Sequence, residues 1–274
     1  MGLRINQNVE AMNAYRHLSN TNNTMSKSLE KLSSGFRINR AADDAAGLSI
    51  SEKLRSQVGG FKVAMQNAQD GISMLQTAEG ALNETTSLLQ RVRDLAVQAA
   101  NGTQDTESRA AADAEVTSAL AEIDRIANST KYGSTSLLSA TAAFTFQVGN
   151  TSAASDKISV SVSAMTTSGL SISGLSISTA AAAGSALASI DFAISTVSSQ
   201  RSQFGAVQNR LEHTVSNLGV AVENLSASES RIRDTDMAAE MVSFTKAQIL
   251  SQAGTAMLSQ ANSAPQSVLS LLKG

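Results

Sequence analysis

The chain contains no cysteine and no tryptophan, and its single proline is Pro265. Without cysteine, a disulfide framework, a thiolate metal site and a cysteine nucleophile are all excluded. The chain also has almost none of the residue that most strongly breaks helices. Only 3% of its residues are aromatic. Its cores must therefore be built from aliphatic side chains, and this composition favours long helices.

Charge of either sign is not in excess, since the formal net charge is −2 over 274 residues. Such a balance gives no broad attraction to nucleic acid or to anionic lipid. No run approaches the roughly 18 consecutive apolar residues of a membrane-spanning helix. The N-terminal sequence has neither the apolar core nor the cleavage site of a secretory signal. We therefore expect no nucleic-acid partner, no membrane partner and no cleaved signal peptide.

The residue patterns of common active sites are missing as well. The two histidines, His17 and His213, do not form the His-Glu-x-x-His pattern of zinc peptidases. The sequence has neither a GxxxxGK phosphate loop nor a GxGxxG dinucleotide motif. Asp43 and Asp44 are adjacent, but the start of a helix explains this acidic pair better than a catalytic dyad does. We predict a protein that is not an enzyme and holds no metal and no cofactor.

Apolar residues recur at alternating spacings of four and three along much of the chain, which is the pattern of a coiled coil. The first such stretch ends near Gly35, a residue that commonly stops a helix. The second runs from about Ser51 to Ala100 and would be roughly 75 Å long at 1.5 Å per residue. A shorter helix ends near Asn128. The seam predicted for the first stretch consists of Leu18, Asn22, Met25, Leu29, Leu32 and Phe36.

The periodicity changes from helical to alternating between residues 143 and 163. Turn-forming residues separate two alternating segments there, so we predict a β-hairpin with a longer loop. The apolar residues of this pattern are Phe144, Phe146, Val148, Ile158, Val160 and Val162. Residues 166–185 are rich in Ser, Ala, Gly and Thr. We expect this segment to be an exposed connector with little core of its own.

The helical pattern returns near Ile190, and a last amphipathic helix starts at Met237. The order is then short helix, long helix, small β element, long helix and short helix. A chain of this layout folds back on itself and brings its termini together. The predicted fold is mainly α, a long antiparallel coiled-coil or helical-bundle rod with a small β-hairpin. Its terminal helices are expected to pair as a coiled coil.

The terminal helices are too few to cover their own apolar residues. Packing supplies most of the stability of a helix in water. Burial of each leucine is worth roughly 1.5–3 kcal/mol, provided that neighbouring helices surround it. Head-to-tail association with copies of the same chain would supply these neighbours and would propagate as a helical polymer. From periodicity alone, an ordinary intramolecular bundle is an equally open interpretation.

Several runs of the sequence resemble the bacterial flagellins. The N-terminal runs are residues 32–48 (LSSGFRINRAADDAAGL), 67–80 (NAQDGISMLQTAEG) and 90–98 (QRVRDLAVQ). The C-terminal runs are residues 205–212 (GAVQNRLE), 229–240 (ESRIRDTDMAAE) and 249–253 (ILSQA). They follow the order of the family, and the resemblance covers nearly everything outside residues 131–189. Because many relatives insert outer domains after the hairpin and this chain has only the Ser/Ala-rich connector, we predict a thin filament.

The resemblance implies a structural subunit that self-assembles into the bacterial flagellar filament for swimming motility. Residues 1–40 with 237–274 would form an inner coiled-coil tube, and residues 41–236 an outer tube. The implied location is extracellular, reached through type III export without a cleaved signal peptide. Further implied partners are hook–filament junction proteins, the filament cap and an export chaperone. A junction protein is itself the alternative function. The residues expected to drive polymerisation are Leu18, Met25, Leu29, Leu32, Met241, Phe244, Leu250, Met257 and Leu258.

The same resemblance implies that Toll-like receptor 5 recognises the monomer. The residues that match the family's receptor site are Arg91, Leu95 and Glu115, and Gln90 and Gln98 lie nearby in the sequence. The plainer interpretation of Arg91 and Glu115 is that they are solvated charges of a helical bundle. Residues 30–51 likewise resemble the segment that plant immune receptors sense.

Overall fold

The computed structural model describes residues 7–273 of the chain. The helices and strands in chain order are α1 (Val9–Ser34), α2 (Ala45–Ala100), α3 (Thr106–Ser129), β1 (Lys131–Tyr132), β2 (Thr135–Ser136), β3 (Ala142–Gln147), β4 (Lys157–Val162), α4 (Ala180–Arg233) and α5 (Met237–Lys273). A short 3-10 turn, Ala154–Asp156, precedes β4. The mainly helical fold with a small β-hairpin is therefore confirmed.

The chain divides into two compact units. The terminal unit comprises residues 1–56 and 224–274, and the central unit comprises residues 57–223. Helices α2 and α4 contribute residues to both units. The predicted inner-tube and outer-tube segments, divided after residues 40 and 236, stay predictions about a filament. Residues 1–6 and 274 of the predicted inner-tube segment lie outside the described residues.

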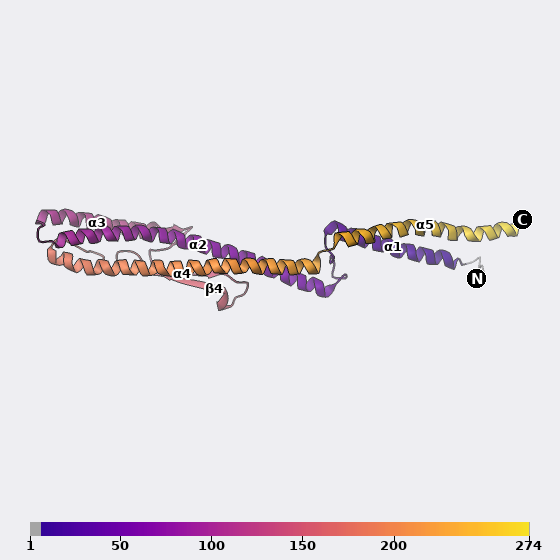
Figure 1. Ribbon diagram of the computed structural model, residues 1–274, viewed down its shortest axis with the longest axis horizontal. Coiled ribbons are helices and arrows are strands. Elements are labelled where there is room, and N and C mark those ends of the chain that lie inside the picture. Colours follow the sequence, from indigo (N-terminus) through magenta and orange to yellow (C-terminus); the bar gives the residue numbers. More distant parts are fainter. Residues whose placement is uncertain (1–6, 274) are drawn as a thin grey trace. The chain divides into compact units, whose positions relative to one another are not determined.

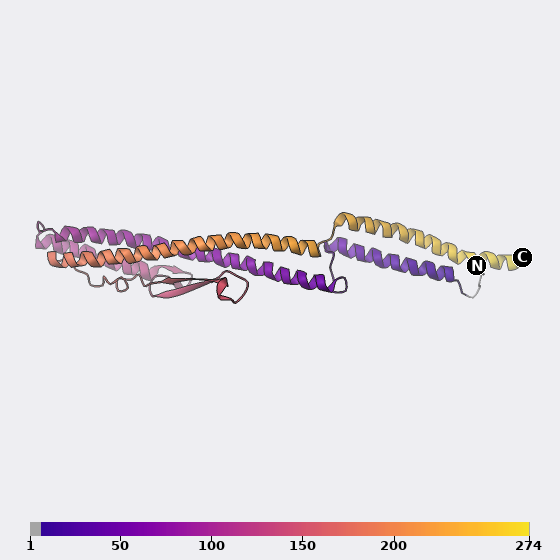
Figure 2. The ribbon, with the colours of Figure 1, turned by 60° about the horizontal axis from the view of Figure 1, so that its bottom comes forward.

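In the terminal unit, α1 and α5 lie side by side in antiparallel orientation (Figures 1 and 2). At one end of the pair, the Asn8 side-chain amide donates a hydrogen bond of 2.7 Å to the Ala261 carbonyl. Toward the other end, Lys31 Nζ lies 3.8 Å from the Glu240 carboxylate. Local sequence sets the ends of α1. The Asn8 side chain accepts a hydrogen bond from an amide of the first turn, and Gly35 ends the helix with φ +75°.

In the central unit, α2, α3 and α4 lie side by side (Figures 1 and 2). Helices α2 and α4 are antiparallel, since Arg93 pairs with Asp191 at 2.7 Å and Gln208 bonds Glu79 at 3.1 Å. Each helix turns a stripe of aliphatic side chains inward, as expected of amphipathic helices. The large side chains of this core that are fully buried on the three helices are Leu75, Leu82, Leu89, Val92, Val116, Ile123, Ile190, Val197, Phe204 and Leu211.

Strands β3 and β4 pair in antiparallel register across residues 142–147 and 157–162. On β4, alternate residues are buried in the core of the central unit, so the alternating sequence pattern predicted this face correctly. The hairpin approaches α2 closely at Gly71, where a Cβ would lie 2.9 Å from Cδ1 of Phe146. Glycine therefore occupies this helical position because the strand leaves no room for a side chain.

The expectation that residues 166–185 form an exposed connector is wrong. Leu170, Ile172 and Ile177 are fully buried and belong to the core of the central unit. Two carboxylates of α3 hold the segment in place. Asp124 accepts hydrogen bonds of 2.8 Å from both the amide and the hydroxyl of Thr167. Asp113 accepts a bond of 2.6 Å from the Ile177 amide. The apolar residues that enter the core are interspersed among many serines. Helix α4 begins at Ala180, inside the expected connector.

Among the described residues, α4 is the one helix long and apolar enough to cross a membrane by length and composition alone. Its sequence carries an inward stripe that packs in the core of the central unit and includes Ile190, Val197 and Phe204. Packing in the core accounts for these inward residues, and 28% of the most apolar 18-residue window of α4 is buried.

Candidate functional site

The contact between α1 and α5 follows a strict rhythm of four and three residues. On α1, apart from the half-buried Glu30 and Lys31, the buried and half-buried positions are Ala11, Ala14, Leu18, Thr21, Met25, Ser28 and Leu32. On α5, they are Glu240, Phe244, Ala247, Ser251, Gly254, Leu258 and Ala261. This is the spacing of a coiled-coil seam, and these residues are called the seam below.

The seam is built largely from small and polar residues. Ser251 Oγ donates a hydrogen bond of 2.9 Å to the Asn22 side chain across the helix pair. A Cβ added at Gly254 would lie 3.3 Å from Cδ1 of Leu18, so the two helices approach closely there. Small residues at a helix contact allow close approach but bury little apolar area per residue. The seam alone therefore leaves most of the large side chains of both helices uncovered.

A second set of apolar side chains on α1 and α5 points outward. Apart from Met237 at the first position of α5, we call them the outward stripe, and they are Val9, Met12, Tyr15, Leu29, Met241, Val242, Ile249, Leu250 and Met257. Val242 is 69% exposed and Met257 is 64% exposed. On α5, side chains from Met241 to Leu250 line a shallow, almost wholly apolar groove together with Lys246. An exposed apolar groove of this kind is typical of an interaction surface.

The nine residues predicted to drive polymerisation fall into these two sets. Five belong to the seam, namely Leu18, Met25, Leu32, Phe244 and Leu258. Four belong to the outward stripe, namely Leu29, Met241, Leu250 and Met257. The seam predicted from sequence is wrong at Asn22, Leu29 and Phe36. Asn22 and Leu29 are exposed, and the neighbouring Thr21 and Ser28 occupy the seam instead. Phe36 lies beyond the end of α1. Sequence reasoning did not select the other five members of the stripe, which are Val9, Met12, Tyr15, Val242 and Ile249.

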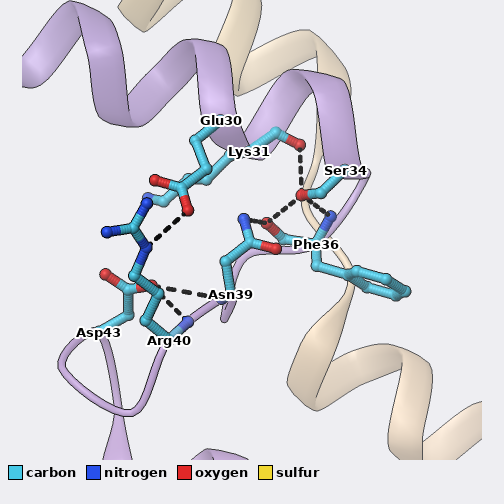
Figure 3. Close-up of polar contacts among 7 residues, drawn as sticks. All are labelled: Glu30, Lys31, Ser34, Phe36, Asn39, Arg40 and Asp43. Atoms are coloured by element: carbon cyan, nitrogen blue, oxygen red, sulfur yellow. Dashed lines mark hydrogen bonds and ion pairs between the residues drawn. The ribbon is translucent and has the colours of Figure 1, made fainter.

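The turn between α1 and α2 is held by side chains of its own sequence (Figure 3). Arg40 pairs with Glu30 at 2.8 Å. The Asp43 carboxylate accepts hydrogen bonds from the Arg40 amide at 3.0 Å and from the Asn39 amide at 3.3 Å. The bond from the Arg40 amide, supported by the Asn39 amide and two lysines, lowers the pKa of Asp43 from its ordinary value. Asp43 is thus a structural carboxylate of the turn.

The same turn is tied to the segment between α4 and α5. Phe36 and Asp234 form an isolated antiparallel bridge, and the guanidinium of Arg233 lies 4.7 Å from the centre of the Phe36 ring. Arg233 also pairs with Glu52 at 2.7 Å. Ile38, in the same turn, is fully buried and lies close to Gly47 of α2. The segment of residues 30–51 is therefore folded into the terminal unit, although many of its side chains remain exposed.

The residues predicted for receptor recognition lie on α2 and α3 of the central unit. Gln90, Arg91, Gln98 and Glu115 are exposed, whereas Leu95 is only 5% exposed and packs in the core. Arg91 Nε donates to the Glu115 carboxylate at 2.8 Å. This hydrogen bond and the charge of Glu115 raise the pKa of Arg91 above its ordinary value. The structure therefore offers a polar, ion-paired surface here, and Leu95 acts as a core residue.

Within the described residues, no group of three histidine, cysteine or acidic side chains is arranged to hold a metal ion. The acidic residues that have defined partners serve as helix caps, turn acceptors and surface ion pairs. Among the described residues, the exposed apolar side chains of α1 and α5 are the features best suited to association.

Comparison with known proteins places these surfaces in context. Residues 5–143 match the model of the bacterial flagellin N-terminal helical region, and residues 187–272 match that of the C-terminal helical region. The chain is 49% identical to the flagellin of Bacillus subtilis (strain 168), with 99% of this chain and 100% of the relative covered. It is 48% identical to the flagellar filament 33 kDa core protein of Treponema phagedenis, with 98% and 99% covered. A solved structure of a putative flagellar hook-associated protein from Vibrio parahaemolyticus is 14% identical in sequence and has a TM-score of 0.58. The match covers 70% of this chain and 100% of that chain, and it shows a shared fold.

Proposed function

The chain belongs to the bacterial flagellin family of filament subunits, and from this premise we propose that it polymerises through its outward stripe to build a filament for swimming motility. The observation that carries the proposal is the exposed apolar surface of α1 and α5. Covering a side chain such as Leu250 or Ile249 is worth roughly 1.5–3 kcal/mol. Several such residues per subunit, covered by neighbouring copies, are sufficient to favour a polymer over free subunits.

The division into seam and outward stripe gives the two sets different roles. Seam residues pair α1 with α5 within one subunit, so they present the stripe in a fixed arrangement. Stripe residues contact other copies head-to-tail, which produces a helical polymer because the two contacting surfaces differ. Residues 1–40 and 237–274 would then form the inner tube and residues 41–236 the outer tube.

The test compares two variants of α5 that add the same charge. In the first, Ile249→Asp and Leu250→Asp place two carboxylates in the outward stripe. In the matched control, Gln248→Asp and Gln252→Asp place them at exposed polar positions of the same helix. Burying unpaired carboxylates at a contact is strongly unfavourable. We expect seeded polymerisation, followed by electron microscopy, to fail for the stripe variant and to persist for the control. Filaments of normal length from the stripe variant would remove the stripe from the mechanism.

The family's location in the extracellular filament also suggests how the subunit travels and what it meets. We propose export through the type III apparatus with a dedicated chaperone, followed by assembly between hook–filament junction proteins and the filament cap. Independence from disulfides is consistent with this route, because the chain has no cysteine to oxidise after export. A hook–filament junction protein is the alternative function. Long filaments from the purified chain alone would argue against that alternative, and short discrete assemblies would support it.

A second proposed function is recognition of the monomer by Toll-like receptor 5 through the exposed polar residues of α2 and α3. The ion pair Arg91–Glu115 is the specific observation in favour, because it holds two charges of adjacent helices on one surface. Leu95 lies in the core, so Leu95→Ala would act through stability, at a cost of about 2–5 kcal/mol. The informative variant is therefore Arg91→Ala with Glu115→Ala.

The chain offers a matched control in the exposed pair Glu122–Arg125 of α3. Both pairs are exposed to solvent, so loss of either should change the stability of the fold little. We expect the Arg91/Glu115 variant to lower activation of a receptor reporter by about tenfold or more, the change that 1.4 kcal/mol of binding produces. The Glu122→Ala and Arg125→Ala control should leave activation unchanged. Equal activation by both variants would contradict the assignment.

A further inference from the structure

The turn between α2 and α3 contains the one Asn-Gly pair of the sequence, Asn101-Gly102. Both residues are exposed. The Asn101 carbonyl accepts a hydrogen bond from the Gln104 amide at 3.2 Å, and the Asn101 side-chain oxygen accepts one from the Thr103 amide at 3.3 Å. The turn thus folds the Asn101 side chain back over the two peptide bonds that follow it.

This geometry favours attack by the Gly102 nitrogen on Cγ of Asn101. No hydrogen bond from the Gly102 amide is present among the described residues, so its proton is free to leave. A Cβ at Gly102 would meet nothing within 4 Å, which shows that the space around this residue is open. The bond from Thr103 polarises the side-chain carbonyl that would be attacked. Holding the reacting atoms near one another lowers the barrier of such an intramolecular step.

The positively charged guanidinium of Arg109 lies beside Asn101. Arg109 donates through Nη2 to the Asn101 carbonyl at 3.1 Å and through Nε to the Ala99 carbonyl at 2.9 Å. The guanidinium favours negative charge that develops on the ring-closing atoms and on the product carboxylate. The C-terminal end of α2 opposes such a charge through its dipole, which amounts to a partial charge, whereas the guanidinium carries a full charge and bonds directly to Asn101.

We propose that Asn101 is a site of self-modification, at which the side-chain amide is converted to a carboxylate. A solvent base removes the proton from the Gly102 nitrogen, which forms a bond to Cγ of Asn101. The bond from Cγ to Nδ2 breaks, and Nδ2 takes up a proton and leaves as ammonia. Water then adds to either carbonyl carbon of the resulting succinimide and opens the ring to aspartate or to isoaspartate. The net change is loss of ammonia and gain of one water, with no oxidant or catalyst.

The isoaspartate product changes the turn because it adds a methylene to the main chain. The hydrogen bond from Gln104 and the contacts of Arg109 depend on the present position of the Asn101 carbonyl. Those bonds tie the end of α2 to the start of α3, so the modified turn is looser. A subunit that is not replaced after assembly would accumulate the change, and the modified fraction would record its age.

Asn101 differs from other asparagines of the central unit. Asn128 is followed by Ser129 within α3, where helical hydrogen bonds hold the next amide. Asn150 is followed by Thr151, whose amide is bonded to the Asp156 carboxylate at 2.8 Å. These two sites serve as internal standards in the same sample.

The test incubates the purified full chain at mildly alkaline pH and follows the tryptic peptide of residues 94–109 by mass spectrometry. Conversion raises the mass by the difference between an amide and a carboxyl group, and chromatography separates the aspartate and isoaspartate forms. The matched variant is Gly102→Ala, because the added methyl group meets nothing in the fold but hinders the attacking nitrogen. A second measurement follows the same peptide in urea, where the turn is absent.

We expect Asn101 to convert well ahead of Asn128 and Asn150, with isoaspartate among the products. Gly102→Ala should slow conversion by about tenfold or more, equivalent to about 1.4 kcal/mol of activation free energy. Conversion in the folded chain should be at least as fast as in urea. A folded chain that stays unmodified while the chain in urea converts, or an unchanged rate in Gly102→Ala, would overturn the proposal.

Discussion

Truncation of Leu170 tests whether the segment between the hairpin and α4 is part of the core. Leu170 is fully buried in the central unit, although it lies in a stretch dominated by serine. Leu170→Ala removes three carbon groups, and at about 0.8 kcal/mol each the transfer term alone is about 2.4 kcal/mol. The cavity left behind adds to this value, so the expected loss of unfolding free energy is about 2–5 kcal/mol.

The assay is urea unfolding of the full chain, followed by circular dichroism. Ser173→Ala is the control, since Ser173 is exposed in the same segment and its truncation should change stability by about 0.5 kcal/mol or less. A Leu170→Ala variant as stable as this control would show that the segment contributes no core. Packing of residues 166–185 against the helices of the central unit would then be refuted.

Two further predictions concern glycine substitutions in α2 and the dependence of stability on pH. Gly71→Ala should destabilise the chain by about 1–3 kcal/mol in thermal or urea unfolding, because its Cβ would lie 2.9 Å from the Phe146 ring. Gly80 lies in the same helix, and a Cβ there would meet nothing within 4 Å, so Gly80→Ala should stabilise the chain by about 0.5–1 kcal/mol. If both variants change stability in the same direction, the close packing of Phe146 against Gly71 is contradicted. The hydroxyl and then the amide of Thr151 lower the pKa of Asp156, so its contribution to stability is present above the unfolded pKa and is lost as pH falls through the lowered folded value. Asp156→Asn should therefore make the melting temperature depend less on pH in the acid range. If the dependence is unchanged, other titrating groups cause the loss of stability in acid.

Helix content and the hairpin could be predicted from sequence because their signals are local. Long stretches with helical periodicity and almost no proline leave few alternatives to long helices. Alternation over residues 143–163 predicted the hairpin, and β4 buries the expected face. The boundary signals were also local, as Gly35 ends α1 in the left-handed conformation that glycine favours.

The register of the terminal seam could not be predicted, because two apolar stripes share the same helix. Counting large side chains placed Leu29 in the seam, whereas the structure places Ser28 there. Small residues form much of the seam, and hydrophobic periodicity gives them little weight. The outward stripe carries many of the larger side chains instead. A sequence pattern reports which positions are apolar and does not report which neighbour covers them.

The Ser/Ala-rich segment was misjudged for a related reason. The composition of the segment predicted that it is exposed. Asp113 and Asp124 of α3, however, accept hydrogen bonds from its backbone amides and a hydroxyl group, and the apolar residues of the segment enter the core. These hydrogen bonds join positions far apart in sequence. Leu95 shows the reverse problem, since a position carried over as a surface residue lies in the core.

Methionine oxidation measures most directly whether neighbouring copies cover the outward stripe. Met241 and Met257 are exposed members of the stripe, whereas Met74 is buried in the central unit and serves as the internal control. Oxidation by peroxide depends on access to the thioether, and each product can be quantified by mass spectrometry. We predict rapid oxidation of Met241 and Met257 in free subunits, marked protection of both in filaments, and slow oxidation of Met74 in either state. Equal oxidation of the two stripe methionines before and after polymerisation would contradict the claim that the outward stripe is the surface through which subunits assemble.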